Sequence, residues 1–115
     1  GGVIIEDDVI VGANSVVSRG VLENTIVGKQ TKIAQLVIIG ANNIIGNNCS
    51  LRSNVMTSGS VRIGNNSVLA PSSTIREYCC IGTNSFVGMG AVVTKSIPDN
   101  ETWIGNPAKL MKNRK

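Results

Sequence analysis

Glu23 and Asn42 are the side chains of this 115-residue chain that best combine a reactive type with a suggestive position. The chain contains no histidine, so a histidine general base and a Ser-His-Asp triad are both impossible. Zinc held by histidines is excluded in the same way, and no metal site is predicted. A carboxylate such as Glu23, beside an interruption of the regular sequence pattern, is then the best candidate to accept a proton.

A period of six residues organises residues 21–98. Thirteen positions share this period, and twelve of them are Val, Ile or Leu, with Thr57 as the exception. They are Val21, Val27, Ile33, Ile39, Ile45, Leu51, Thr57, Ile63, Leu69, Ile75, Ile81, Val87 and Val93. The residue four positions after each of them is usually small. An unbroken hexapeptide period predicts a parallel β-helix, in which each hexad forms one short strand and one bend.

The size of the coils follows from this period. Three hexads would close one triangular coil of about 18 residues, and coils would stack at roughly 4.8 Å. Residues 1–98 are therefore predicted to form an all-β parallel β-helix of about five coils. Residues 99–115 are predicted to form a loop with a basic tail, of which residues 108–115 are a short helix or coil. We expect Trp103 to cover the open end of the last coil.

The register changes near the start of the chain. Ile5, Val11 and Val17 keep a hexad register of their own, and residues 17–20 supply four residues where six are expected. We interpret this change as one altered corner of the helix. The first residues contain no polar capping element, so we expect the chain to begin inside a longer protein.

The coil length also predicts which residues stack. Residues 18 apart should lie in successive coils, so Glu23 is expected beside Ala41, and Asn24 beside Asn42. The same column continues to Ser60 and Tyr78, which gives one polar, partly exposed corner. It is either a functional corner or an ordinary solvated one with Asn in left-handed turns.

Charge and composition exclude several partners. The net charge is +4, and the tail residues Lys109, Lys112, Arg114 and Lys115 account for all of it. With aromatic residues at 3%, a broad nucleic-acid surface is not expected. The basic end either contacts a phosphate-bearing ligand or stays solvated.

The three cysteines do not form a disulfide framework. Cys49 and Cys79 fall on the small inward positions of the repeat, and Cys80 falls on an outward or corner position. This usage fits a reducing compartment. No apolar run is long enough for a membrane span, and no signal peptide is recognisable, so we predict a cytoplasmic protein.

Two stretches carry a resemblance to known enzymes. Residues 2–20, 25–28 and 36–42 resemble bacterial N-acyltransferases that act on UDP-3-O-acylglucosamine in lipid A synthesis. Residues 88–98, followed by Gly105-Asn106-Pro107-Ala108-Lys109, are similar to sugar acetyltransferases of the same left-handed β-helix superfamily. The combination resembles enzymes that acetylate amino sugars on nucleotide carriers in lipopolysaccharide or glycan synthesis.

The resemblance implies a left-handed β-helix that forms a homotrimer, with active sites between subunits. It implies acetyl-CoA or another acyl-CoA as co-substrate, with no tightly bound cofactor. The residues expected to contact the donor are Gly88, Gly90, Ala91, Thr94, Lys95, Gly105, Asn106, Pro107 and Lys109. Backbone N–H groups at the glycine corners would hold the thioester oxygen, and Lys109 would meet a CoA phosphate.

The resemblance also assigns the acceptor side. The lipid A enzymes have a histidine base after Ile-Gly, whereas Ala41 follows Ile39-Gly40 here. In some related sugar N-acetyltransferases an acidic residue one coil earlier contacts the sugar amine. Glu23 occupies that place by sequence spacing, and Glu23 and Asn42 are the expected catalytic residues.

Three functions remain open at this stage. The first is an acyl-CoA-dependent N-acyltransferase acting on a nucleotide-linked amino sugar. The second is an acetyltransferase acting on another small acceptor, such as a free sugar or an amino alcohol. The third is a non-catalytic β-helix that serves trimerisation, which the missing histidine favours. The ending at residues 105–109 favours the first two, with CoA or an acyl-carrier protein as the donor.

Overall fold

The computed structural model describes residues 1–114, and in these residues every regular element is a β-strand. The strands are β1 (Val3–Ile5), β2 (Ile10–Val11), β3 (Val16–Val17), β4 (Thr25–Val27), β5 (Lys32–Ile33), β6 (Ile38–Ile39), β7 (Ile44–Ile45), β8 (Ser50–Leu51), β9 (Met56–Thr57), β10 (Arg62–Ile63), β11 (Val68–Leu69), β12 (Thr74–Ile75), β13 (Cys80–Ile81), β14 (Phe86–Val87), β15 (Val92–Val93), β16 (Glu101–Ile104) and β17 (Lys109–Asn113). No helix in this part of the chain has the length and apolar character needed to cross a membrane.

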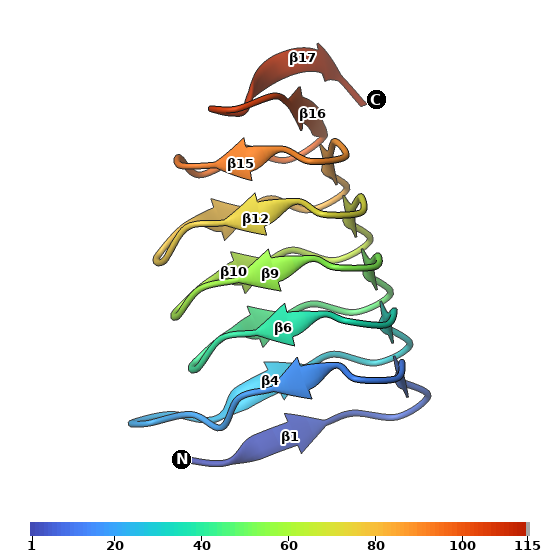
Figure 1. The fold of residues 1–115 in the computed structure, drawn as a ribbon, viewed down its shortest axis with the longest axis vertical. Helices are drawn as coiled ribbons and strands as arrows, with labels where there is room; N and C mark the ends of the chain where they lie inside the picture. The colour runs from blue at the N-terminus through green and yellow to red at the C-terminus, as the bar shows by residue number, and fades with distance from the viewer. Residues whose placement is uncertain (115) are drawn as a thin grey trace.

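The strands form three sheets that make the faces of a prism (Figure 1). Sheet A has the order β1-β4-β7-β10-β13, sheet C has the order β15-β12-β9-β6-β3, and sheet B runs β17-β16-β14-β11-β8-β5-β2. In Figure 1 sheet C faces the viewer, and its connections to sheet A lie at the left edge as the chain rises from β1 to β16. The chain is therefore a left-handed parallel β-helix, as predicted.

The interior confirms the hexad pattern. Twelve of the thirteen period positions, from Val27 to Val93, are buried, and the small residues four positions later are buried too. From the second to the fifth coil, partners are 18 residues apart, as in the pair Ile26 and Ile44. In the last turn they are 16 residues apart, as in the pair Phe86 and Thr102. Val21 breaks the pattern, because it is 70% exposed and lies outside the helix wall. The interior is filled by Val, Ile and Leu, which fit its narrow section better than aromatic rings.

The register change is an insertion, whereas the sequence was interpreted as a shortened corner. Val3 pairs with Thr25 and Val16 pairs with Ile38, so the partners of the first and second coils are 22 residues apart. Four residues beyond the usual 18 are thus accommodated between β3 and β4. They form a projecting loop, residues 18–24, at the lower left of Figure 1.

The C-terminal segment adds a sixth turn to the predicted five. Ile97 bridges Ile81, and β16 pairs in parallel with β14. On the third face, the Val92 N–H donates to the Gly105 carbonyl at 3.0 Å. The turn was missed in the sequence because its residues leave the hexad period.

The predicted C-terminal helix or coil is also wrong. Residues Lys109–Asn113 form β17, which pairs antiparallel with β16. Trp103 is partly buried and packs against the core, which agrees with its expected position over the last coil. The hairpin of β16 and β17 gives sheet B an antiparallel edge.

Candidate active site

One edge of the prism gathers most of the predicted chemistry. The turns that connect sheet C to sheet A comprise residues 18–24, 40–43, 58–61, 76–79 and 94–96, and we refer to them as the C–A edge. Asn42, Ser60 and Tyr78 stand at successive turns of this edge with φ of 58°, 58° and 66°. Asn adopts this left-handed conformation more readily than most residues, whereas a bulky side chain does so at a cost.

Glu23 lies in the projecting loop between β3 and β4, and its side chain lies near Arg62 of β10. Its Oε1 lies 3.9 Å from Nη2 of Arg62, and the Glu23 side chain is 77% exposed. Nη1 of Arg62 donates to the Asn42 carbonyl at 2.5 Å. Asn42 in turn accepts a hydrogen bond on Oδ1 from the Val21 N–H at 2.9 Å. Glu23 and Asn42 are thus brought together, with Arg62 joining them.

Arg62 is the residue of this cluster that sequence reasoning missed. It occupies an outward position of sheet A between Ile44 and Cys80, its partners in the neighbouring coils. The available signal was a single charged residue in a column that is otherwise apolar or uncharged. Only the fold shows that this column lies next to the loop that carries Glu23.

The position of Glu23 corrects the predicted column. In regular turns of this edge, the Ser60 N–H donates to the Ala41 carbonyl and the Tyr78 N–H donates to the Gly59 carbonyl. At the first such turn, the Asn42 N–H donates instead to Oγ1 of Thr25 at 3.0 Å. Glu23 therefore reaches the site from the inserted loop, where the backbone does not make the hydrogen bond of the regular turns.

A pocket of about 230 Å³ lies near the other end of the same edge. Its lining combines the turn after β15 with the hairpin of β16 and β17: Thr94, Lys95, Trp103, Pro107, Ala108, Lys109 and Leu110. Four of the residues predicted to contact an acyl donor are among them. We refer to this cavity as the donor pocket.

The other predicted donor contacts lie elsewhere in the wall. The Gly88 N–H donates to the Trp103 carbonyl at 2.9 Å, and Ala91 is fully buried in the core. Gly90 is exposed at a corner with φ of 68°, which a glycine adopts without strain. Gly105, with φ of 95°, and Asn106 form the turn that brings Pro107 to the donor pocket.

The spacing of the two clusters follows from the coil repeat. Asn42 and Lys95 lie on the same edge and are separated by three turns, or about 14 Å at the usual strand spacing. A ligand that runs along the C–A edge would therefore contact both clusters.

Two of the thiols are poor nucleophiles. Burial raises the pKa of Cys49 and of Cys79, because it removes water from the thiolate. Sγ of Cys49 donates to the Gly64 carbonyl at 3.1 Å, as hydroxyls do at equivalent positions. These two cysteines therefore pack in the interior and do not act as nucleophiles.

Comparison with known proteins places the chain in a family. The profile described as "Bacterial transferase hexapeptide (six repeats)" matches residues 44–77 and 60–95, and "Hexapeptide repeat of succinyl-transferase" matches residues 2–22. The chain belongs to the hexapeptide-repeat family of transferases. The repeat that fills the core is thus the same feature that defines the family.

Individual relatives agree with this family. UDP-3-O-acylglucosamine N-acyltransferase of Caulobacter sp. (strain K31) is 36% identical over 112 residues, covering 97% of this chain and 33% of the relative. The crystal structure of UDP-N-acetylglucosamine O-acyltransferase from Moraxella catarrhalis RH4 superposes with a TM-score of 0.95 at 26% identity, covering 98% of this chain and 45% of that one.

A third similarity concerns the fold alone. Perosamine N-acetyltransferase from Caulobacter crescentus, solved as a mutant in complex with CoA and GDP-perosamine, superposes with a TM-score of 0.81 at 22% identity. The match covers 97% of this chain and 54% of that chain. The chain spans about a third of the length of the curated relatives it matches, such as 33% and 31% of the first two.

Proposed function

We propose that this chain carries the site of an acyl-CoA-dependent N-acyltransferase, with acetyl-CoA as the donor and a nucleotide-linked amino sugar as the acceptor. The observation that carries the proposal is the C–A edge, along which Glu23 and the donor pocket are aligned. The relatives act on nucleotide sugars by name, and one neighbour in structure binds CoA with a GDP-sugar.

The donor pocket supplies groups that suit CoA. Lys95 and Lys109 bring two positive charges to its lining, and both side chains are exposed. Ammonium groups pair well with phosphates, and Trp103, Pro107 and Leu110 offer apolar surface to the pantetheine arm. The arm would then follow the edge toward Asn42 and Glu23.

On the acceptor side, the reaction requires that the amine is positioned and that its proton is removed. The amine nitrogen attacks the thioester carbonyl carbon, a C–N bond forms, and the C–S bond breaks. CoA leaves as the thiolate, and the proton lost by the amine passes to Glu23 directly or through a water. Glu23 then returns this proton to the CoA sulfur, so that the free thiol is released and the carboxylate is restored. Holding the free amine against the thioester supplies most of the acceleration through proximity, so a histidine base is not required.

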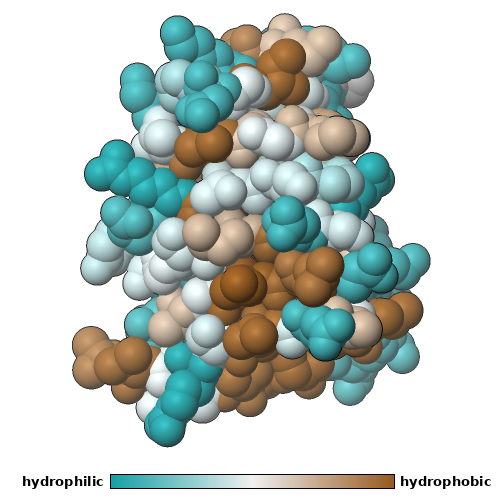
Figure 2. All heavy atoms as spheres, viewed as in Figure 1, coloured by the Kyte–Doolittle hydropathy of each residue, from teal (hydrophilic) through white to brown (hydrophobic). Residues whose placement is uncertain are grey.

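We further propose that the sites lie between copies of the chain in a homotrimer. Outward-facing apolar side chains gather over the first three coils, with Val16, Ile38 and Met56 on sheet C and Ile44 on sheet A all exposed. Figure 2 shows apolar residues concentrated over the lower half of the face formed by sheet C. Contiguous exposed apolar surface of this kind marks interaction sites.

Thermal melting with acetyl-CoA tests the donor. A ligand that binds only the folded chain at a hundredfold excess over Kd adds about 2.7 kcal/mol of stability, so the melting temperature should rise. The variant Lys109→Gln should reduce that rise. If neither acetyl-CoA nor a longer acyl-CoA raises the melting temperature, the acyl-CoA donor is wrong. The chain would then use an acyl-carrier-protein donor or be a non-catalytic β-helix.

Turnover of the variant Glu23→Gln tests the acceptor side. We expect the rate with a UDP- or GDP-linked amino sugar to fall by about 10²-fold or more, since a general base contributes that much. Glu6→Gln is the matched control, because Glu6 is an exposed carboxylate in the turn between β1 and β2, away from the C–A edge. Equal rates for wild type and Glu23→Gln would remove Glu23 from the mechanism.

A further inference from the structure

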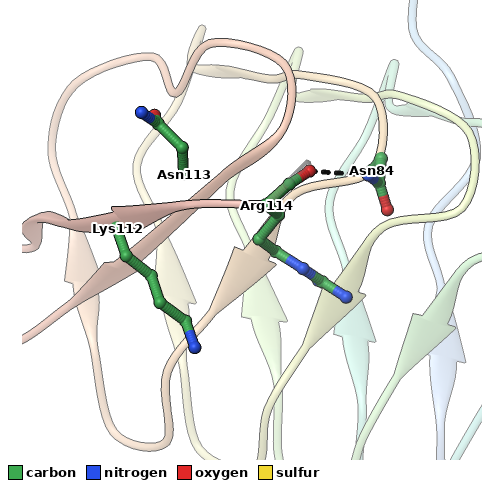
Figure 3. A pocket seen from close by; sticks show the side chains of 4 residues that line it. All are labelled: Asn84, Lys112, Asn113 and Arg114. Carbon is green, nitrogen blue, oxygen red and sulfur yellow. Dashed lines mark hydrogen bonds between the residues drawn. The ribbon is translucent and has the colours of Figure 1, made fainter.

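A second cavity lies on the face of sheet B, beside the end of β17. Its volume is about 350 Å³, and it is lined by Asn84, Lys112, Asn113 and Arg114 (Figure 3). In Figure 3 the side chains of Lys112 and Arg114 point to the same side of β17, and Asn113 points to the other. The lining therefore brings two cations and amide groups together, with no carboxylate among its residues.

The backbone of Arg114 is held firmly in this position. Its N–H donates to the Asn100 carbonyl at 2.5 Å. Its carbonyl accepts a hydrogen bond from Nδ2 of Asn84 at 3.2 Å, and the same amide group donates to Oδ1 of Asn100 at 2.9 Å. The two asparagines stand at one corner of the prism in successive turns. These hydrogen bonds therefore fix the backbone from which the Arg114 side chain extends.

The guanidinium group of Arg114 has an unmet hydrogen-bonding requirement. Its Nη1 is buried and has no hydrogen-bond partner among the described residues. A buried donor without an acceptor is costly, and more so when it carries charge. The same group lies over the ring of Phe86, with 5.5 Å between Cζ and the ring centre. The ring holds the cation in place but provides no acceptor for Nη1.

An apolar cavity adjoins this basic one. It has a volume of about 340 Å³ and shares Lys112 and Arg114 with the first. Its remaining lining is Phe86, Thr102, Ile104 and Met111. Together the two cavities present an anion-binding part and an apolar part, and each is within the size range of small-molecule sites.

We propose that these adjoining cavities bind a nucleoside phosphate. The phosphate accepts hydrogen bonds from Arg114 and Lys112 and satisfies Nη1, because guanidinium groups match the geometry of phosphate oxygens. The base lies against the apolar side chains Ile104 and Met111. This site is on sheet B, whereas the donor pocket opens near the C–A edge, so the inference does not depend on the proposed function.

Isothermal titration calorimetry of the 1–115 chain with AMP tests the proposal. AMP should bind, more weakly as salt is added, and more tightly than either adenosine or inorganic phosphate alone. Arg114→Gln should weaken AMP binding by roughly tenfold or more, because a charge-assisted contact is lost. Lys32→Gln is the matched control, since Lys32 is an exposed cation on the same face of sheet B.

A second variant separates binding from stability. Phe86→Leu keeps an apolar side chain but removes the ring beneath the guanidinium, and it should also weaken AMP binding. Melting curves without ligand show whether each variant remains folded. Absence of AMP binding to the folded wild type, or equal binding by Arg114→Gln and Lys32→Gln, would overturn the proposal.

Titration of the same variants with acetyl-CoA identifies the source of the nucleotide. If Arg114→Gln weakens AMP alone, the ligand is a free nucleotide. If it weakens both and AMP competes with acetyl-CoA, the ligand is the nucleotide end of the acyl donor.

Discussion

Tyr78 gives the sharpest prediction of stability, because its backbone conformation conflicts with its side chain. Its φ is 66°, and the residue is 77% exposed at the C–A edge. The equivalent position one coil earlier is Ser60, and two coils earlier it is Asn42. The left-handed conformation brings Cβ of an L-residue close to its own carbonyl oxygen, and Asn relieves part of that cost through local hydrogen bonds.

The expected magnitude follows from this cost. Left-handed geometry costs a bulky residue about 1–2 kcal/mol, and Asn recovers much of it. Little apolar burial is lost with an exposed ring, so we expect Tyr78→Asn to raise the free energy of unfolding by about 1 kcal/mol. For a chain of this size, that corresponds to roughly 4 °C in melting temperature.

Urea unfolding measures this change most directly. The midpoint should rise while the slope of the unfolding free energy against urea concentration stays the same, since the buried area is unaltered. Leu36→Asn should behave alike, because Leu36 is also exposed and has φ of 59°. Met89→Asn is the control: Met89 is 75% exposed and is not among the residues with positive φ, so its midpoint should not rise.

Either of two outcomes would contradict this prediction. If Tyr78→Asn lowers the midpoint while Leu36→Asn raises it, the phenol makes a stabilising contact that outweighs the backbone cost. If all three variants change the midpoint equally, the effect comes from surface polarity and backbone geometry plays no part.

Two further predictions concern the interior. Oγ1 of Thr57 donates to Oδ1 of Asn43 at 2.5 Å. Thr57→Val should lower the free energy of unfolding by about 1–3 kcal/mol, because it leaves that oxygen unsatisfied. In a double-mutant cycle of urea unfolding, the double variant with Asn43→Val should recover part of the loss. Burial raises the pKa of Cys49 above its ordinary value of 9.0, so the folded chain keeps this proton at a pH where the unfolded chain loses it. The free energy of unfolding should therefore fall as pH rises above 9.0. Urea unfolding should show a shallower fall for Cys49→Ser, and equal falls for this variant and the wild type would contradict the prediction.

Much of the fold could be read from the sequence because a solenoid makes mostly near-neighbour contacts. The hexad period alone identified the buried residues from Val27 to Val93 and the stacking of residues 18 apart. The prediction of the fold was wrong where the sequence departs from the hexad period. Residues 18–24 proved to be an insertion, since a local change of register does not say whether residues were added or removed.

The candidate site could also be predicted only in part from the sequence. The sequence by itself determined the repeat, the absence of histidine, and the candidates Glu23, Asn42, Thr94, Lys95, Pro107 and Lys109. Only the tertiary structure decided that Arg62 lies between Glu23 and Asn42. It also decided that β16 and β17 fold back to form three cavities with the last coils. A period fixes which side chains point inward along each coil, whereas contacts of an inserted loop or a terminal hairpin depend on where the chain lies in space.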